Sequence, residues 1–350
     1  MHQKLLKKTT IYCFVFFVIA MVGMFYFDAK KVIVIANSDE GVTKPDSEMT
    51  ENLQTQYQLL MQNDTSNAKQ ITIPLENAIL AEDVQIQNHY IDNELWIGIN
   101  GATAEFYSQE YIVGDLENVQ YGGYDMVGDI LWIKLAMKDT FEFESTMNNG
   151  KLTIKVQKPT EVYDKIIILD AGHGGKDKGD SEGRVSEKKL TLDVLLILQE
   201  KFKESDIKVY YTRTDDTQVD NEKRIQLANS VGADMLISLH TAYSEDSSLH
   251  GVTTIYNGNY FIQDFGSIQL SDILEQSVAQ TTGANANGLQ DATEDDFLVK
   301  EAKVPAAQIN IGYLSNEEER KLLQDEEYQQ LIADGIYYAI MEIYEENLEK

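Results

Sequence analysis

Hydrophobic and polar residues are unevenly distributed along the chain, and the first strong feature is an apolar segment near the N-terminus. Ile11–Phe27 is an unbroken uncharged run, preceded by Lys4, Lys7 and Lys8. At about 1.5 Å per helical residue, such a run approaches the thickness of the hydrocarbon core of a bilayer. Lysines before the run mark the cytoplasmic side. The pattern predicts a transmembrane signal anchor at 9–27.

The end of this run distinguishes an anchor from a cleaved signal peptide. Phe25, Tyr26 and Phe27 are bulky, whereas a signal-peptidase site needs small residues. We therefore favour an uncleaved anchor over a cleaved signal. Both interpretations place the rest of the chain outside the cytoplasmic membrane.

A polar segment separates the apolar run from the first regular pattern. Residues 28–70 are rich in Asp, Glu, Asn, Gln, Ser and Thr, which predicts a tether, with a weak helix around Tyr57–Met61. Between 71 and 157, apolar and polar residues alternate in short stretches separated by turn signals such as Asn100-Gly101. Period-two patterning with such turns is typical of antiparallel strands. We therefore predict a small all-β domain at 71–157.

The remaining region, 164–350, alternates strand and helix patterns. Apolar residues at helical spacing predict several helices. One follows Ser186, one ends at Asn229, one covers Gln263–Thr282, and one runs from a Ser315–Glu318 capping box to the C-terminus. Between these helices lie apolar stretches with the character of buried strands: KIIILDAG, IKVYYTR, ADMLISLH, GVTTIYN and AAQINIGYL. This alternation predicts an α/β domain with a mostly parallel sheet flanked by helices.

Charge and cysteine content narrow the range of partners. The chain has 29 Lys and Arg against 58 Asp and Glu, a formal net charge of −29. Because binding to a phosphate backbone needs a basic surface, this argues against a nucleic-acid partner. The only cysteine, Cys13, lies in the apolar run, so no disulfide within the chain is expected.

Two histidines end predicted strands, where open α/β sheets place their sites. His173 follows KIIILDAG within Asp170-Ala171-Gly172-His173-Gly174-Gly175, and His240 closes ADMLISLH. Glu187 begins the next helix and can turn back over the first strand. Taken singly, each residue is explained as a solvated loop or helix-end residue. Together they predict a His₂Glu zinc site with an open position for water.

The same residues lie within stretches that resemble a known family. From Ile166 to about Tyr344 the chain is similar to zinc-dependent N-acetylmuramoyl-L-alanine amidases. The similar stretches are IIILDAGHGG, SEKKLTLDV, VYYTR, the R-x-x-x-A-N of Arg224–Asn229, GADMLISLH, GVTTIY and VPAAQINIGYLSNEEE. The resemblance implies that His173, Glu187 and His240 bind Zn²⁺. It also implies hydrolysis of the amide between N-acetylmuramic acid and L-alanine in peptidoglycan. The 71–157 region resembles the amidase N-terminal (AMIN) domain, with a ligand-free spacer as the alternative.

Two positions depart from the family pattern. In P-A-x-x-x-E-x-G-(F/Y)-x-S-N the Glu is the family's general acid–base, and this chain has Asn310 there. An amide cannot take or give a proton, and general acid–base catalysis contributes roughly 10²–10⁴-fold. The family usually has Asn two residues after the histidine at His240, and this chain has Ala242.

These departures leave two functional hypotheses open. The first is a peptidoglycan amidase, active or slow, which the retained His173, Glu187 and His240 favour. The second is a catalytically silent amidase-fold module that binds peptidoglycan or a division or sporulation partner, which Asn310 favours. A different zinc peptidase chemistry fits the flanking stretches less well.

Overall fold

The computed structural model describes residues 35–37, 57–258, 265–346 and 348. The chain divides into two compact units, Met1–Gln157 and Lys158–Lys350, which are considered separately. The predicted anchor at 9–27 lies outside the described residues. Within the described ranges, no helix is both long and apolar enough to cross a membrane.

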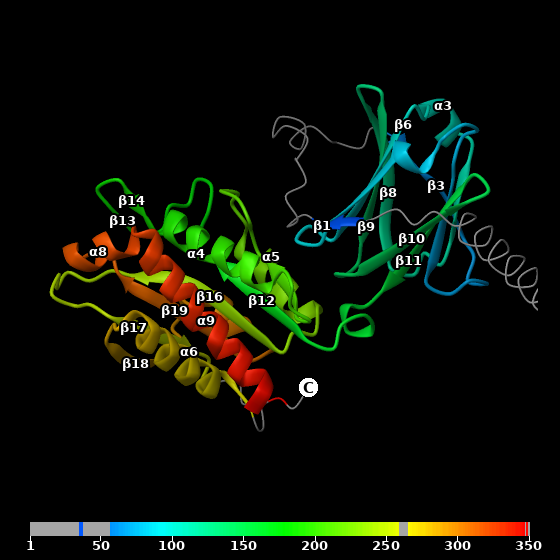
Figure 1. The fold of residues 1–350 in the computed structure, drawn as a ribbon. Helices are drawn as coiled ribbons and strands as arrows, with labels where there is room; N and C mark the ends of the chain where they lie inside the picture. The colour runs from blue at the N-terminus through cyan, green and yellow to red at the C-terminus, as the bar shows by residue number, and fades with distance from the viewer. Residues whose placement is uncertain (1–34, 38–56, 259–264, 347, 349–350) are drawn as a thin grey trace, which may run out of the picture. The chain divides into compact units, whose positions relative to one another are not determined.

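The first unit contains two β-sheets, as the period-two pattern predicts (Figure 1). One sheet has the order β1-β5-β6-β9-β8-β2: Ile35–Asn37, Val84–His89, Glu94–Asn100, Ile130–Met137, Val119–Val127 and Tyr57–Gln58. The other has the order β10-β11-β4-β7-β3: Glu142–Asn148, Lys151–Gln157, Gln70–Pro74, Tyr111–Gly114 and Leu60–Asn63. A short helix, α3 (Ala104–Tyr107), follows β6. Buried side chains from both sheets form one core, so the sheets pack face to face.

The β-unit begins before residue 71, which corrects the predicted tether at 28–70. β1, β2 and β3 lie within that range, and the weak helix expected at Tyr57–Met61 is instead β2 and the start of β3. β2 and β3 are both sheet edges, and their side chains are exposed or half-buried. Their composition therefore resembles a polar linker, although Leu59 between them is buried in the core.

The second unit is built on one six-stranded sheet of order β15-β12-β16-β19-β17-β18. The strands are Lys208–Tyr211, Ile166–Ala171, Met235–Ala242, Ala306–Tyr313, Val252–Tyr256 and Ala286–Asp291. Neighbours are parallel except β17 and β19, which are antiparallel. The predicted sheet flanked by helices is confirmed, and the sheet is mixed rather than wholly parallel. A two-stranded hairpin, β13 (Ser181–Glu182) and β14 (Val185–Ser186), precedes α4.

Helices cover both faces of this sheet. α4 (Glu187–Phe202), α6 (Ser267–Thr282) and α9 (Glu326–Glu346) pack together over one face (Figure 1). Their buried residues share one apolar core with alternate residues of β12 and β16. α5 (Asn221–Ser230) contacts α7 (Phe297–Glu301), and α7 contacts β16, β17 and β19. Because the buried residues of α5 and α7 are not part of that core, these two helices lie on the opposite face.

Several elements of this unit differ from the sequence prediction. The sequence pattern does not predict β18 or α7, because β18 is largely exposed and α7 is only about one turn long. The predicted C-terminal helix is two helices, α8 (Glu317–Leu323) and α9. α8 is capped by the side chain of Asn316 rather than Ser315. Asp325 lies between the two helices and caps the second, since its carboxylate accepts the backbone N–H of Glu327 and Tyr328.

We expect α9 to be stabilised mainly by its buried face. Ile340 is fully buried against the main core, so Ile340→Ala should lower the free energy of unfolding by about 2–5 kcal/mol. Leu331 on the same helix is 40% exposed, and Leu331→Ala should change it by only about 0.5 kcal/mol. Urea denaturation of both variants measures the difference. Equal losses would show that α9 is not anchored by this face.

Candidate functional site

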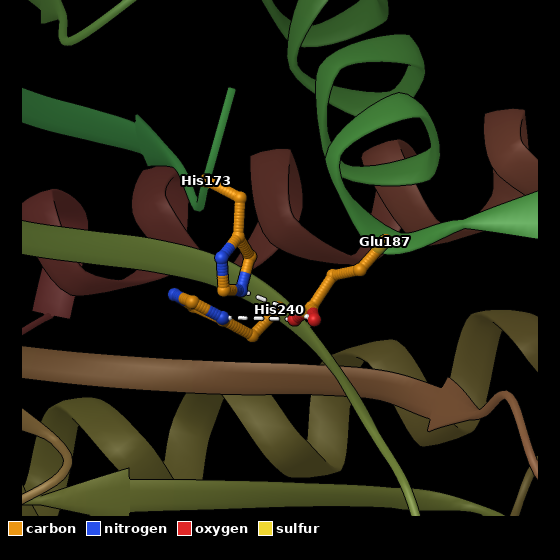
Figure 2. A group of neighbouring side chains, drawn as sticks. All are labelled: His173, Glu187 and His240. Atoms are coloured by element: carbon orange, nitrogen blue, oxygen red, sulfur yellow. Dashed lines mark hydrogen bonds and ion pairs between the residues drawn. The ribbon is translucent and has the colours of Figure 1, made fainter. Parts of the chain in front are cut away.

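Three side chains predicted from the sequence converge at one end of the mixed sheet (Figure 2). β12 and β16 are parallel neighbours, which brings His173, just beyond β12, close to His240 near the end of β16. Glu187, the first residue of α4, lies between them. His173 Nε2 is 3.1 Å from Glu187 Oε2, and His240 Nδ1 is 2.9 Å from Glu187 Oε1. One potential ligand atom of each residue lies within 4.8 Å of the others.

Glycines make this convergence sterically possible. A Cβ atom on Gly172 would lie 2.4 Å from the imidazole of His240, and one on Gly179 would lie 2.4 Å from Glu187 Oε2. Both distances are far below any tolerable contact. His173 itself has φ of 64°, a left-handed conformation that is unfavourable for a non-glycine residue. The turn after β12 is therefore shaped to present His173 to Glu187.

Hydrogen bonds and the two histidines offset the cost of burying the carboxylate of Glu187. Its Oε2 accepts the backbone N–H of Asp180, and its Oε1 accepts that of Thr241, both at 2.9 Å. Burial alone would raise the pKa of Glu187. The hydrogen bonds and positive charge of His173 and His240 outweigh burial and hold the pKa well below its usual range. The carboxylate of Glu187 is therefore ionised at neutral pH.

Asp177 is a site residue that the sequence did not reveal. Its Oδ2 lies 2.8 Å from His173 Nδ1, and its Oδ1 accepts the backbone N–H of Gly179. A carboxylate on Nδ1 orients the ring so that Nε2 faces Glu187. The one available signal was an acidic residue four positions after the histidine, within the same glycine-rich loop.

A cavity of about 340 Å³ opens beside the two histidines. Gln308 of β19 lines it together with His173 and His240. Its walls come from the segment before α5 and from the start of α7, and they are strongly acidic. The acidic lining residues are Asp170, Asp177, Asp220, Glu222, Asp295 and Asp296.

Asn310 lies in β19 directly beside His240 in the register of the two parallel strands. Its side chain is 8% exposed and hydrogen-bonded on both sides. Nδ2 donates to Thr253 Oγ1 at 3.2 Å, and Oδ1 accepts from Gln308 Nε2 at 3.3 Å. Through Gln308, Asn310 is connected to the cavity. Ala242, the other departure, contributes its backbone carbonyl, which accepts the N–H of Leu314.

The three converging side chains have the donor chemistry of a metal site. Two imidazole nitrogens and one ionised carboxylate are ligands suited to zinc, and the adjoining cavity leaves space for a further ligand. Glu319 of α8 is not part of this group of three side chains. It is buried and accepts the backbone N–H of Gly251 and Tyr313, which is a structural role.

The metal-free site should titrate in a characteristic way. Burial alone would lower the pKa of His173, but the hydrogen bonds and negative charges of Glu187 and Asp177 outweigh it and raise the pKa to about 9. In the unfolded chain the value is about 6.5. Protonated His173 therefore stabilises the fold fully below about pH 6.5, and this contribution is lost as the pH rises through about 9. Asp177→Asn should lower the pKa of His173, as measured by NMR titration.

Asp220→Asn is the matched control for this titration. Asp220 lines the same cavity, and no hydrogen bond or ion pair joins it to His173 in the described structure. Its removal should leave the pKa of His173 nearly unchanged. An equal fall in both variants would mean that the general charge of the cavity, and not the Asp177 contact, sets the pKa.

Comparisons with known proteins identify relatives of this chain. The germination-specific N-acetylmuramoyl-L-alanine amidase of Bacillus subtilis is 29% identical over 198 residues, covering 52% of this chain and 81% of that protein. The amidase LytC of Bacillus subtilis is 25% identical over 249 residues, covering 70% of this chain and 48% of its own length.

Among solved structures, the chain is similar to the CwlD amidase from Clostridioides difficile in complex with the GerS lipoprotein, with 32% sequence identity and a TM-score of 0.48. The similarity covers 52% of this chain and 99% of that chain. Residues 167–342, half of the chain, match the family model described as N-acetylmuramoyl-L-alanine amidase. The chain therefore belongs to the N-acetylmuramoyl-L-alanine amidase family.

Proposed function

We propose that this protein is a zinc-dependent amidase that hydrolyses the bond between N-acetylmuramic acid and L-alanine in peptidoglycan. The observation that carries the proposal is the convergence of His173, Glu187 and His240 beside an open cavity, in a chain of this family. These three residues would hold the ion. A bound zinc ion supplies Lewis acidity, which polarises a carbonyl and lowers the pKa of water to about 7.

The residues of the chain supply orientation and charge around the scissile amide. Asp177 fixes the ring of His173, and backbone N–H groups fix Glu187. A departing L-alanine amine must receive a proton. Asn310 cannot provide it, because a carboxamide does not ionise near neutral pH. We therefore propose that proton delivery limits turnover in this protein.

A second candidate function follows from the environment of Asn310. Its amide is held by Gln308 and Thr253 in a continuous hydrogen-bonded chain, which is compatible with a binding role that needs no proton transfer. In this alternative the protein is a silent amidase-fold module that binds peptidoglycan.

Restoring the family carboxylate distinguishes the two candidates. Gln308 Nε2 and the Thr253 hydroxyl can both donate to a carboxylate, so Asn310→Glu has hydrogen-bond partners in place. The variant should release peptide from purified sacculi roughly 10²-fold faster than the native protein, with unchanged zinc content. Muropeptide analysis measures the rate, and metal analysis measures the zinc.

Two matched variants complete the experiment. Asn310→Gln has the length of the glutamate variant without its charge and should give no increase. His173→Ala should abolish both zinc binding and release. A native rate that Asn310→Glu leaves unchanged would mean that another group is the acid. Binding of sacculi without release by either protein would favour the silent module.

We also propose that the chain is a single-pass membrane protein with its bulk in the cell envelope, where peptidoglycan lies. The support is the apolar run at 9–27 with its preceding lysines. We further propose that the first unit is an AMIN-like domain, on the basis of the period-two pattern of its sequence. Protease added to spheroplasts should digest the chain beyond about residue 31, where the apolar run has ended. Complete protection of the Lys158–Lys350 unit would contradict this topology.

A further inference from the structure

Two buried arginines contact the turn that carries His173. Arg224 of α5 is 3% exposed, and Arg213, just beyond β15, is 4% exposed. The sequence pattern assigns neither a role, although Arg224 begins the R-x-x-x-A-N stretch. A buried guanidinium is costly unless its donors are paired, so the groups that it binds indicate what it does.

Arg224 connects the turn that carries His173 to strands β12 and β16 of the sheet. Its Nη2 donates to the backbone carbonyl of His173 at 2.7 Å, and its Nη1 donates to that of Ala171 at 2.9 Å. Nη1 also forms an ion pair with Asp170 of β12. Asp170 in turn accepts a 2.5 Å hydrogen bond from Ser238, two residues before His240 on β16. Arg224 thus couples the elements that carry the two histidines.

Arg213 connects the same turn to the helix of Glu187. Its Nε donates to the carbonyl of Ala171 at 2.9 Å, and its Nη2 donates to that of Gly172 at 2.8 Å. Nη2 also donates to the carbonyl of Lys188 at 2.8 Å and to Thr191 Oγ1 at 3.2 Å. Lys188 and Thr191 are in the first turns of α4, which begins at Glu187.

The two guanidinium groups together engage three successive carbonyls, those of Ala171, Gly172 and His173. This stretch leads into the left-handed conformation of His173, which has φ of 64°. A non-glycine residue keeps such a conformation only where surrounding contacts enforce it. These contacts reach the elements that carry all three converging side chains. The arrangement therefore determines where His173 lies relative to Glu187 and His240.

We propose that Arg213 and Arg224 are positioning residues of the metal centre, which fix the His173 turn against the Glu187 helix and the His240 strand. This inference rests on the proposed function, because it assumes that the three side chains bind zinc. Lysine keeps the positive charge but cannot form the several directed hydrogen bonds of a guanidinium group. Arg213→Lys and Arg224→Lys should therefore misplace the ligands while leaving the local charge unchanged.

The test measures the affinity of the full chain for Zn²⁺ by chelator competition, together with the thermal midpoint of the metal-free protein. Residues that orient metal ligands typically account for 10–100-fold in affinity, so we expect a loss of about 10-fold or more in each lysine variant. Visible absorption of the Co²⁺-loaded protein, which reports coordination geometry, should change as well. Arg320→Lys is the control, because Arg320 also donates to a backbone carbonyl, that of Leu314, and in the described structure no hydrogen bond or ion pair joins it to His173, Glu187 or His240.

The outcomes separate this inference from the function on which it rests. Absence of Zn²⁺ binding by the native chain overturns both the metal site and the inference. If the native chain binds Zn²⁺ and both lysine variants bind it with the same affinity, the inference alone is overturned, even where the thermal midpoints of the variants fall. A loss of affinity equal to that of Arg320→Lys would also overturn it.

A milder variant decides the matter should the lysine variants fail to fold. Thr191 Oγ1 lies where Arg213 and the carbonyl of Gly172 meet, and Thr191→Val is nearly isosteric. We expect several-fold weaker Zn²⁺ binding from a folded protein, because the link between the turn and α4 loses its hydroxyl. Unchanged affinity in this variant would overturn the proposal.

Discussion

The candidate site depends on one constraint: the carboxylate of Glu187 is buried and charged. A buried carboxylate is strongly unfavourable unless hydrogen bonds and opposite charge compensate it. Backbone N–H groups of Asp180 and Thr241 and the ring of His240 provide hydrogen bonds, and the protonated ring of His173 provides the opposite charge. The close approach of these groups leaves no space for side chains at Gly172 and Gly179. The local chain path thus follows from the need to surround one charge.

Much of the fold could be predicted from the sequence, because apolar periodicity reports directly on burial. β12 and β16 are buried and apolar, and parallel neighbours end at the same edge, so their pattern alone is enough to bring His173 and His240 together. The exposed strands β2, β3 and β18 were not predicted, since edge strands with polar side chains resemble linkers.

The surroundings of the three side chains could not be predicted in the same way. Asp177 reaches His173 only because the loop after β12 folds back on itself, and periodicity carries no information about loop paths. Arg213 and Arg224 act through backbone carbonyls, which every residue has, so no sequence pattern shows their partners. The environment of Asn310 likewise depends on Thr253, which is adjacent only through an antiparallel pairing of β17 and β19.

The amide at position 310 has an electrostatic consequence for the metal-free protein. The cavity already carries several carboxylates, including Asp177 and Asp220, and a glutamate beside His240 would add another near Glu187. Like charges raise each other's pKa and destabilise the ionised forms. Without a bound cation, the fold with Asn310 avoids that repulsion, and His173 remains protonated up to about pH 9. A histidine binds a metal ion only through its neutral imidazole, so the zinc binding that we propose would displace this proton at neutral pH. In this chain His173, Glu187 and His240 therefore form an ion-paired cluster, and a metal ion held there as we propose would compete with the proton for the ring of His173.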